Sequence, residues 1–375
     1  MSLRLSVVVF ALLALGACAT GRAGRTEVIK FDPVVITPGS PEERELANLN
    51  DDELFALGTS AYAAGDWAKA ARCFERLADA YPQSPHFGAA TYNAGLSLER
   101  TGKYGEALER FRVLADPAKG KGDALDAAFR VAECHYHLDD YPPAIEVLTT
   151  LAAREDIPAQ DQLQARVHRG ICLVENGQLD EAERQLRESL GWWERRNQIE
   201  RLDEYFPSQA QFFLGEIYRL YFEHVELNPD RGEEKLGEDL EYKCELLLSA
   251  QGHYLRSIRI GHGQWATSSG FRIGALYETL YDAMLNARVP ADLNEEEAEI
   301  YRKELRKRVR VLITKAISIY ERTLAAAERI GSETPFVEQT RRSLERMKDI
   351  LLEEPETAEP AAEEPAGGPQ AQPAS

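Results

Sequence analysis

The chain has 375 residues, of which 44% are hydrophobic, and it carries a formal net charge of −19 at pH 7. This length is enough for one extended helical array or for two domains. Nucleic acids and bare anionic lipid surfaces are bound mainly through lysine and arginine side chains. The negative net charge of the chain therefore argues against both as partners. Basic patches or apolar segments of other proteins suit such a chain better.

The first element along the chain is an apolar N-terminal segment. Met1 to Ala17 contains a single positive charge, Arg4, followed by an apolar run from Leu5 to Leu15. The run is far shorter than the ~20 residues that a membrane-spanning helix needs, so residues 1–17 are predicted to be a secretory signal peptide. Residues 18–50 contain several glycines and prolines and little periodicity, which predicts a tether.

A cysteine follows the apolar segment, and Leu15-Gly16-Ala17-Cys18 is similar to the bacterial lipoprotein box. The resemblance implies cleavage before Cys18 and attachment of acyl chains, such as palmitate, to its thiol and new amino group. A plain signal peptide that contains a cysteine is the alternative. More than one acyl chain, at ~0.8 kcal/mol per buried methylene, can hold a soluble domain on a bilayer. Ala19 follows where similar lipoproteins of the inner membrane carry aspartate, so the resemblance implies the outer membrane, facing the periplasm.

Four stretches after the tether share one register. A turn position recurs 37, 37 and 38 residues apart, at Gly65, Gly102, Asp139 and Gly177. Five residues further on, each stretch has an alanine: Ala70, Ala107, Ala144 and Ala182. Nine residues further on, each has a large apolar residue: Phe74, Phe111, Leu148 and Leu186. Self-similarity at a period of about 20 to 50 residues indicates a solenoid of stacked repeats.

The fullest copy runs from Asp51 to Pro82 and resembles the tetratricopeptide repeat. Its first helix carries Gly58 on its apolar face and ends at the Gly65-Asp66 turn, and the second helix stops at Pro82. The family has a glycine near the end of the first helix, a small residue where the two helices touch, and often a closing proline. The other copies place Gly95, Ala132 and Gly170 at the helix contact.

The resemblance implies an all-α helix-turn-helix solenoid with about four regular repeats at residues 51–190. Two elongated units of similar type are predicted at 191–331, a C-terminal capping helix at 332–352 and a disordered tail at 353–375. Asn294 with Glu297 predicts the start of a long helix that reaches Arg329. The basic cluster from Arg302 to Arg310 is interpreted as a solvated face paired with Glu295 to Glu299, or as a docking site for an acidic partner.

No catalytic motif, cofactor loop or metal site is predicted. The chain has no G-x-S-x-G elbow, no glycine-rich phosphate loop and no H-E-x-x-H, and His135 and His137 point in different directions on a helix. We therefore predict neither enzymatic activity nor a small-molecule substrate. Four cysteines besides Cys18 are predicted to be buried free thiols: Cys73, Cys134, Cys172 and Cys244.

Protein binding is the predicted activity. In the repeat family, first helices line a concave groove, and the resemblance implies that their fifth, twelfth and thirteenth residues face a partner. The fifth positions give Phe55, Tyr92, Phe129, Val167, Phe212 and Phe271; the twelfth and thirteenth give Tyr62, Arg100, Tyr136 and His137. Packing of the fifth position against the neighbouring repeat is the alternative.

A lipid anchor followed by tandem repeats is similar in plan to the BamD-like lipoproteins of the β-barrel assembly machinery. The resemblance implies a periplasmic scaffold that binds other envelope proteins or peptide segments, with precursors of outer-membrane proteins as the implied partners. Two alternatives stay open: a component of a gliding-motility or pilus machine, and a coordinator of peptidoglycan synthesis or hydrolysis.

Overall fold

The structure is a computed structural model that describes residues 45–118, 122–289 and 293–353. The predicted signal peptide, Cys18, most of the tether and the predicted tail lie outside the described residues. The chain divides into two compact units, residues 1–48 and 49–375. In the first unit, the described residues 45–48 contain one helical turn. The rest of the description concerns the second unit.

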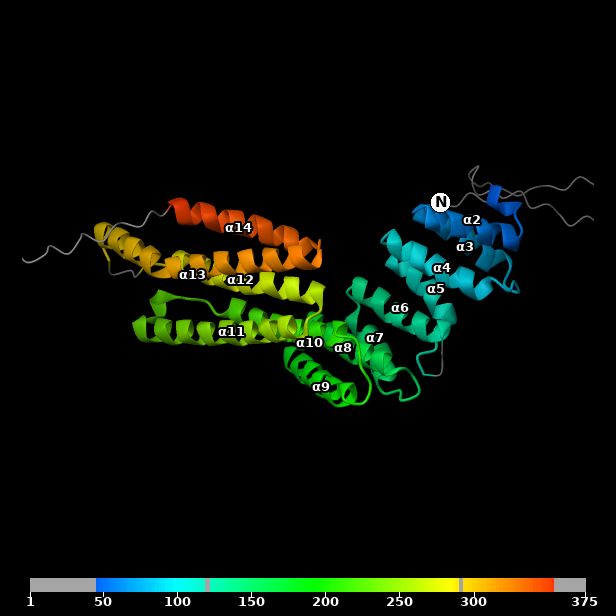
Figure 1. Ribbon diagram of the computed structural model, residues 1–375, viewed down its shortest axis with the longest axis horizontal. Helices are drawn as coiled ribbons and strands as arrows, with labels where there is room; N and C mark the ends of the chain where they lie inside the picture. Colours follow the sequence, from blue (N-terminus) through cyan, green and yellow to red (C-terminus); the bar gives the residue numbers. More distant parts are fainter. Residues whose placement is uncertain (1–44, 119–121, 290–292, 354–375) are drawn as a thin grey trace, which may run out of the picture. The chain divides into compact units, whose positions relative to one another are not determined.

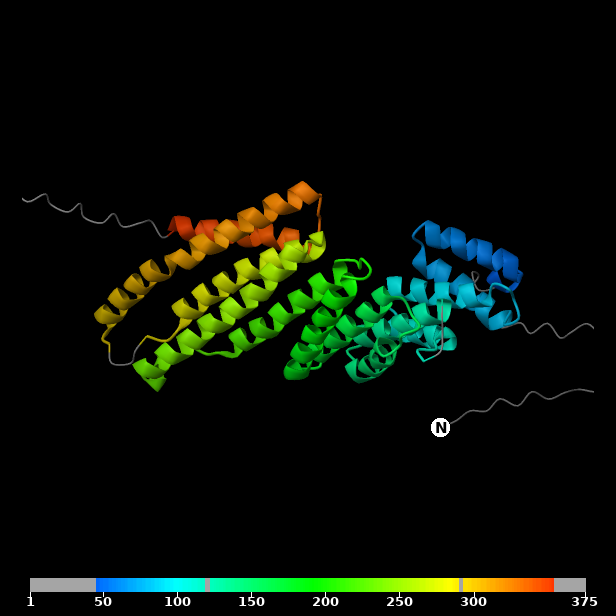
Figure 2. The ribbon, with the colours of Figure 1, turned by 60° about the horizontal axis from the view of Figure 1, so that its bottom comes forward.

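The described part of the second unit is entirely helical apart from turns and loops, and each helix packs on its neighbours in the chain (Figures 1 and 2). The helices of the regular repeats are α2 (Asp51–Ala63), α3 (Trp67–Ala80), α4 (Phe87–Arg100), α5 (Tyr104–Leu114), α6 (Asp123–His137), α7 (Tyr141–Ala152), α8 (Ala159–Glu175) and α9 (Leu179–Asn197). They are followed by α10 (Tyr205–His224), a 3-10 turn η1 (Pro229–Arg231), α11 (Glu233–Ile260), α12 (Gly263–Asn286), α13 (Glu295–Ile330) and α14 (Pro335–Glu353).

The helices form antiparallel pairs, four regular and two elongated. The second half contains much longer helices than the first, with 28 residues in α11 and 36 in α13. The Asn294 side chain accepts hydrogen bonds from the backbone N–H groups of Glu296 and Glu297. In turn, the Glu297 carboxylate accepts a hydrogen bond from the backbone N–H of Asn294. This capping box confirms the predicted start of the long helix. At 1.5 Å per residue, α13 is about 54 Å long.

The repeat turns share a backbone conformation that explains their residue types. Gly65, Gly102 and Gly177 have φ values of 78°, 75° and 74°, and Asp139 has 55°. These values lie in the left-handed region, which glycine adopts without steric cost and aspartate more readily than most other residues. Aspartate therefore replaces glycine in the third repeat without a change of turn.

A glycine or alanine lets the two helices of each unit approach closely. A Cβ atom placed on Gly58, Gly95 or Gly170 would lie 2.6 to 2.7 Å from a side-chain atom of Phe74, Phe111 or Leu186 respectively. The elongated units repeat the arrangement with Gly215 against Tyr254 and Gly274 against Tyr320. The predicted register thus extends into the elongated units, because the same glycine contact joins both helices in five of the six units, and the third has Ala132 at this position.

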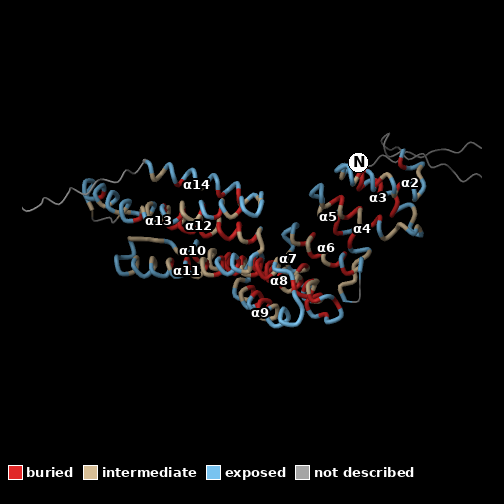
Figure 3. The backbone as a smooth tube through the Cα atoms, in the orientation of Figure 1, coloured by how far each residue is buried: buried red, intermediate tan, exposed pale blue. Residues whose placement is uncertain are grey.

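Buried residues follow the faces where helices meet (Figure 3). The regular repeats bury mostly alanine, leucine and phenylalanine, whereas the elongated units surround the fully buried Tyr254 and Tyr320 with further aromatic rings. Cys73, Cys134 and Cys172 are buried, Cys244 is half-buried, and all four are free. Burial raises the pKa of each thiol, which keeps these cysteines protonated at neutral pH.

The close approach at Gly274 predicts a measurable packing penalty. The Gly274→Ala side chain would place its Cβ in steric overlap with the ring of Tyr320, and Tyr320 is fully buried. Gly252→Ala is the matched control, because Gly252 also lies within a long helix but its Cβ would meet only Arg256 at 3.6 Å. Both changes gain similar helix propensity, so we expect Gly274→Ala to be less stable than Gly252→Ala by about 1 to 3 kcal/mol. Urea unfolding followed by circular dichroism measures the difference; equal stabilities would contradict the packing argument.

Candidate functional site

The first helices of the first three repeats meet at a hollow of about 310 Å³, which we call the charged pocket. Eight residues line it: Tyr62, Leu96, Glu99, Arg100, Tyr104, Arg130, Glu133 and His137. Tyr62 comes from α2, Arg100 from α4 and His137 from α6, each near the C-terminal end of its helix. The register of the repeats therefore brings three of the predicted partner-binding residues to one place.

Arg130 forms ion pairs with two glutamates that line the charged pocket. Arg130 Nη1 lies 2.8 Å from Glu133 Oε2 and 3.4 Å from Glu99 Oε2. The Glu99 side chain is only 14% exposed, and its burial raises the pKa of its carboxyl group although Arg130 opposes the shift. The pocket thus combines fixed positive and negative groups, which suits a partner segment that contains charges of both signs.

Aromatic rings frame the charged pocket. Tyr62 contacts Trp67 edge to face at 4.8 Å between centroids, and the Arg100 guanidinium lies 5.7 Å from the Trp67 centroid. On the other side, Tyr104 stacks on His137 at 4.3 Å. Arg100 and His137 are nevertheless exposed. Rigid rings next to exposed charged or polar groups are typical of protein-binding surfaces.

A second hollow of about 280 Å³ adjoins the first, and we call it the aromatic pocket. Its lining contains Ala132, Glu133, Tyr136, His137, Leu148, His168, Ile171, Cys172, Tyr205, Gln209, Phe213 and Trp265. Glu133 and His137 line both pockets, so the two lie next to each other along α6. Burial lowers the pKa of His168, which leaves its imidazole neutral at pH 7. The aromatic pocket can therefore receive a large apolar side chain without facing a buried charge from His168.

The fifth-position aromatic residues lie elsewhere. Phe55 and Tyr92 pack edge to face on Phe74 and Phe111, the second-helix residues of their own repeats. Three further fifth positions also pack inward: Phe129 against the core of the third repeat, Val167 fully buried, and Phe271 against Tyr320 and Phe336.

Phe212 is only 4% exposed and belongs to the core of the elongated units. Its ring contacts Tyr254 and Trp265, at 5.5 and 5.1 Å between centroids. Burial of this side chain removes it from the surface that a partner can reach. Among the predicted residues, Tyr62, Arg100, Tyr136 and His137 line the two pockets.

Three rings and three charged residues at the pockets were not singled out in the sequence. Trp67, Tyr104 and Tyr141 each stand two residues after a turn position, so the repeat period contains a signal for them. Each contacts a predicted residue: Trp67 meets Tyr62, Tyr104 meets His137, and Tyr141 meets Tyr136 at 5.9 Å. Glu99, Arg130 and Glu133 follow no period, and only the folded arrangement brings them together.

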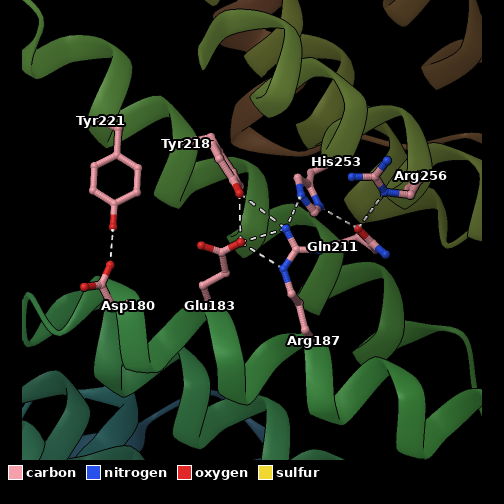
Figure 4. A network of polar contacts seen from close by, with 8 residues as sticks. All are labelled: Asp180, Glu183, Arg187, Gln211, Tyr218, Tyr221, His253 and Arg256. Atoms are coloured by element: carbon pink, nitrogen blue, oxygen red, sulfur yellow. Dashed lines mark hydrogen bonds and ion pairs between the residues drawn. The ribbon is translucent and has the colours of Figure 1, made fainter. Parts of the chain in front are cut away.

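A polar network joins the last regular repeat to the first elongated unit (Figure 4). Glu183 of α9 accepts hydrogen bonds from Arg187 and from the Tyr218 hydroxyl, the latter at 2.8 Å. His253 of α11 has Gln211 Oε1 at 2.9 Å from Nδ1 and Arg187 Nη2 at 3.5 Å from Nε2. Burial lowers the pKa of His253 to about 3, so the imidazole is neutral and acts as a structural hydrogen-bonding group.

Among the described residues, no cluster of three or more His, Cys, Asp or Glu side chains could hold a metal ion. Within the same ranges, no helix combines the length and apolar character required to span a bilayer.

Comparison with known proteins agrees with this geometry. A family model described as "Tetratricopeptide repeat" matches residues 55–122 and, in an overlapping second match, residues 92–159. This part of the chain is similar to tetratricopeptide repeats, and the described residues from 49 onward form an all-α solenoid of helical hairpins. A search of curated proteins found no significant match. The class that the fold defines is a protein-interaction scaffold, because stacked repeats create extended binding surfaces.

Solved structures with a similar fold have low sequence identity. The chain is similar to the MamA protein, with 13% identity over 56% of this chain and 96% of that chain and a TM-score of 0.37. It is also similar to a tetratricopeptide repeat protein from Parabacteroides merdae, with 13% identity, 80% and 98% coverage and a TM-score of 0.36. A TPR repeats protein from Bacteroides fragilis shows 12% identity, 80% and 99% coverage and a TM-score of 0.27.

Proposed function

We propose that this protein is a lipid-anchored scaffold of the bacterial envelope that holds a segment of another envelope protein in its groove. The observation that carries the proposal is that the charged and aromatic pockets adjoin each other and share Glu133 and His137. An apolar anchor beside a charged region matches how protein partners are recognised, with a buried aromatic or aliphatic group surrounded by polar contacts. The protein acts as a scaffold and not as an enzyme.

The proposed location rests on the sequence around Cys18. A small-residue cleavage site before that cysteine supports lipid attachment, and Ala19 supports the outer membrane with the solenoid in the periplasm. Assembly of outer-membrane proteins is the process that this plan favours. A gliding-motility or pilus machine and the coordination of peptidoglycan synthesis or hydrolysis are the alternatives.

The partner is identified by crosslinking intact cells that make a tagged copy, purifying that copy from the outer-membrane fraction, and analysing bound proteins by mass spectrometry. Barrel-assembly proteins among them would support outer-membrane protein assembly. Motility or pilus proteins would support the second process, and wall enzymes together with pelleting on purified sacculi would support the third. Recovery of the protein only from the soluble periplasm would contradict the anchor.

Arg100→Glu combined with His137→Ala is expected to release the crosslinked partner. Both side chains are exposed and line the charged pocket, so the change alters the surface and leaves the core intact. We expect recovery of the partner to fall at least tenfold, since losing two interface contacts of about 1 kcal/mol or more each changes affinity by that order. The measurement is quantitative mass spectrometry of the crosslinked material.

Arg184→Glu is the control, because Arg184 is exposed on α9 and lines neither pocket. It makes the same charge change as Arg100→Glu, so it reports on non-specific electrostatics. Equal partner recovery by the groove variant and the wild type, with helix content unchanged in both, would show that the partner binds elsewhere.

A further inference from the structure

The N-terminal half of α13 carries a row of cations. Arg302, Arg306 and Arg310 are spaced four residues apart, and Lys303 and Lys307 form a parallel series beside them, so all five lie on one side of the helix. We call these five residues the basic row. Arg302, Lys303, Arg306 and Lys307 are exposed. Arg308 in this half of the helix pairs with Glu304, and within the described ranges no ion pair joins any of these four exposed cations to a carboxylate.

The helix α14 covers the same side of α13 further along. Lys348 Nζ of α14 lies 2.7 Å from Glu321 Oε1 of α13. Lys303 precedes Glu321 by 18 residues, which is about five turns at 3.6 residues per turn, so both point the same way. Arg310 precedes Glu321 by 11 residues, about three turns. The basic row therefore continues the face of α13 that α14 occupies.

The described chain ends beside the basic row. The two helices run in opposite directions, and in both ribbon views α14 stops short of the first turns of α13. Glu353 lies five residues beyond Lys348, which places the end of α14 level with about residue 316 of α13. From there, Arg310 is about 9 Å and Arg302 about 21 Å further along the helix axis.

The residues that follow have the opposite charge. Residues 354–375 contain no lysine or arginine and five glutamates: Glu354, Glu356, Glu359, Glu363 and Glu364. A segment of this length can span on the order of 70 Å, which is more than the distance to Arg302. A short tether also gives a segment an effective concentration of about millimolar at a neighbouring site.

We propose that the acidic segment 354–364 binds the basic row of α13 in the same molecule. The basic row is then a site for acidic ligands that the chain itself occupies, and a partner protein with an acidic segment must displace the tail. Attraction between exposed charges is screened by salt, so occupancy falls as ionic strength rises.

The test is zero-length crosslinking of the purified full chain with a carbodiimide. The reagent activates a carboxylate, a lysine amine attacks it, and an amide forms as the reagent leaves as its urea. We expect peptides that join Lys303 or Lys307 to Glu354–Glu364, with a yield at least fivefold lower at 0.5 M than at 0.02 M salt. The Lys348–Glu321 pair is an internal positive control. Equal mixtures of ¹⁴N- and ¹⁵N-labelled protein show whether each crosslink lies within one molecule.

Arg302→Glu with Arg306→Glu reverses two charges of the basic row but retains both reactive lysines. We expect this variant to lose at least four fifths of the tail crosslinks and to keep the Lys348–Glu321 crosslink. Arg341→Glu with Arg342→Glu is the matched control, because both arginines are exposed in the N-terminal half of α14, the half farther from the basic row.

Three results would overturn the proposal. One is absence of tail crosslinks when the Lys348–Glu321 product forms. Another is tail crosslinks that occur only between differently labelled molecules, which would assign the row to a second copy. The last is a tail yield that charge reversal does not change.

Discussion

Replacing Glu216 by glutamine is expected to lower the free energy of unfolding by about 3 kcal/mol, because Arg272 then loses its carboxylate partner and Arg219 keeps only the more exposed Glu223. The Glu216 side chain is 9% exposed, and it lies 3.0 Å from Arg219 and 2.9 Å from Arg272. It also accepts a hydrogen bond from the hydroxyl group of the fully buried Tyr254. Glutamine has the same shape as glutamate and can still accept the hydrogen bond from Tyr254, so the lost stability measures the effect of removing the negative charge. Urea unfolding at neutral pH measures it.

Glu223→Gln is the control for this charge effect. Glu223 lies on the same helix and pairs with the same Arg219, at 2.5 Å, but its side chain is 41% exposed. Exposed pairs contribute about 0 to 1 kcal/mol, so we expect a change within that range. Equal losses for Glu216→Gln and Glu223→Gln would show that burial does not distinguish the two carboxylates.

Buried glutamates distinguish the elongated units from the regular repeats. Glu278 does in α12 what Glu216 does in α10: it accepts a hydrogen bond from Tyr320 at 2.7 Å and pairs with Arg346 at 2.5 Å. In both units a tyrosine takes the place that phenylalanine or leucine has in the regular repeats. The larger residue needs a partner for its hydroxyl group, and the buried glutamate supplies one.

The repeat fold was predictable because its determinants are local and periodic. The turn at Gly65 and its equivalents requires a residue that tolerates positive φ, and the contact between Gly58 and Phe74 requires a residue without a side chain. Both requirements recur at fixed spacing, so they are visible in the sequence. The elongated units keep the glycine contacts, but their longer helices separate Gly274 from Tyr320 by 46 residues, which obscures the period.

The candidate site was predictable only in part. Register alone places Tyr62, Arg100 and His137 at the groove, because equivalent positions of stacked repeats share a face. The repeat register does not determine whether a ring at a given helical position is exposed in the groove or buried. Phe212 is an example, because Trp265 of α12 packs on its ring and covers it. The charges at Glu99 and Arg130 come together through the stacking of α4 on α6, which no single repeat encodes.

His253→Gln is expected to remove much of the acid sensitivity of the protein. Burial and the neighbouring Arg256 and Arg187 lower the pKa of His253 to about 3, against an ordinary value near 6.5. A lowered folded-state pKa means that the unfolded chain binds the proton more tightly, so stability is fully present above pH 6.5 and is lost as pH falls toward 3. At 1.36 kcal/mol per pH unit, the loss from this residue between pH 6.5 and 4 is about 3 kcal/mol.

The geometry around His253 explains why protonation is unfavourable. The N–H at Nδ1 donates to Gln211, and Nε2 accepts from Arg187, so a proton on Nε2 would face the guanidinium group. Tyr218 stacks on the ring at 5.4 Å, and Glu183, the neighbouring carboxylate, is already paired with Arg187. None of these groups can accept a new proton from Nε2 unless the network in Figure 4 is rearranged.

The measurement is the pH dependence of urea unfolding between pH 7 and 4, taken as the difference between variant and wild type. The difference is needed because burial raises the pKa of the carboxyl groups of Glu99 and Glu175, and these shift stability in the opposite direction as pH falls. His224→Gln is the matched control, since His224 is exposed at the end of α10. Parallel stability curves for wild type and His253→Gln would show that His253 is not the acid-sensitive group of this junction.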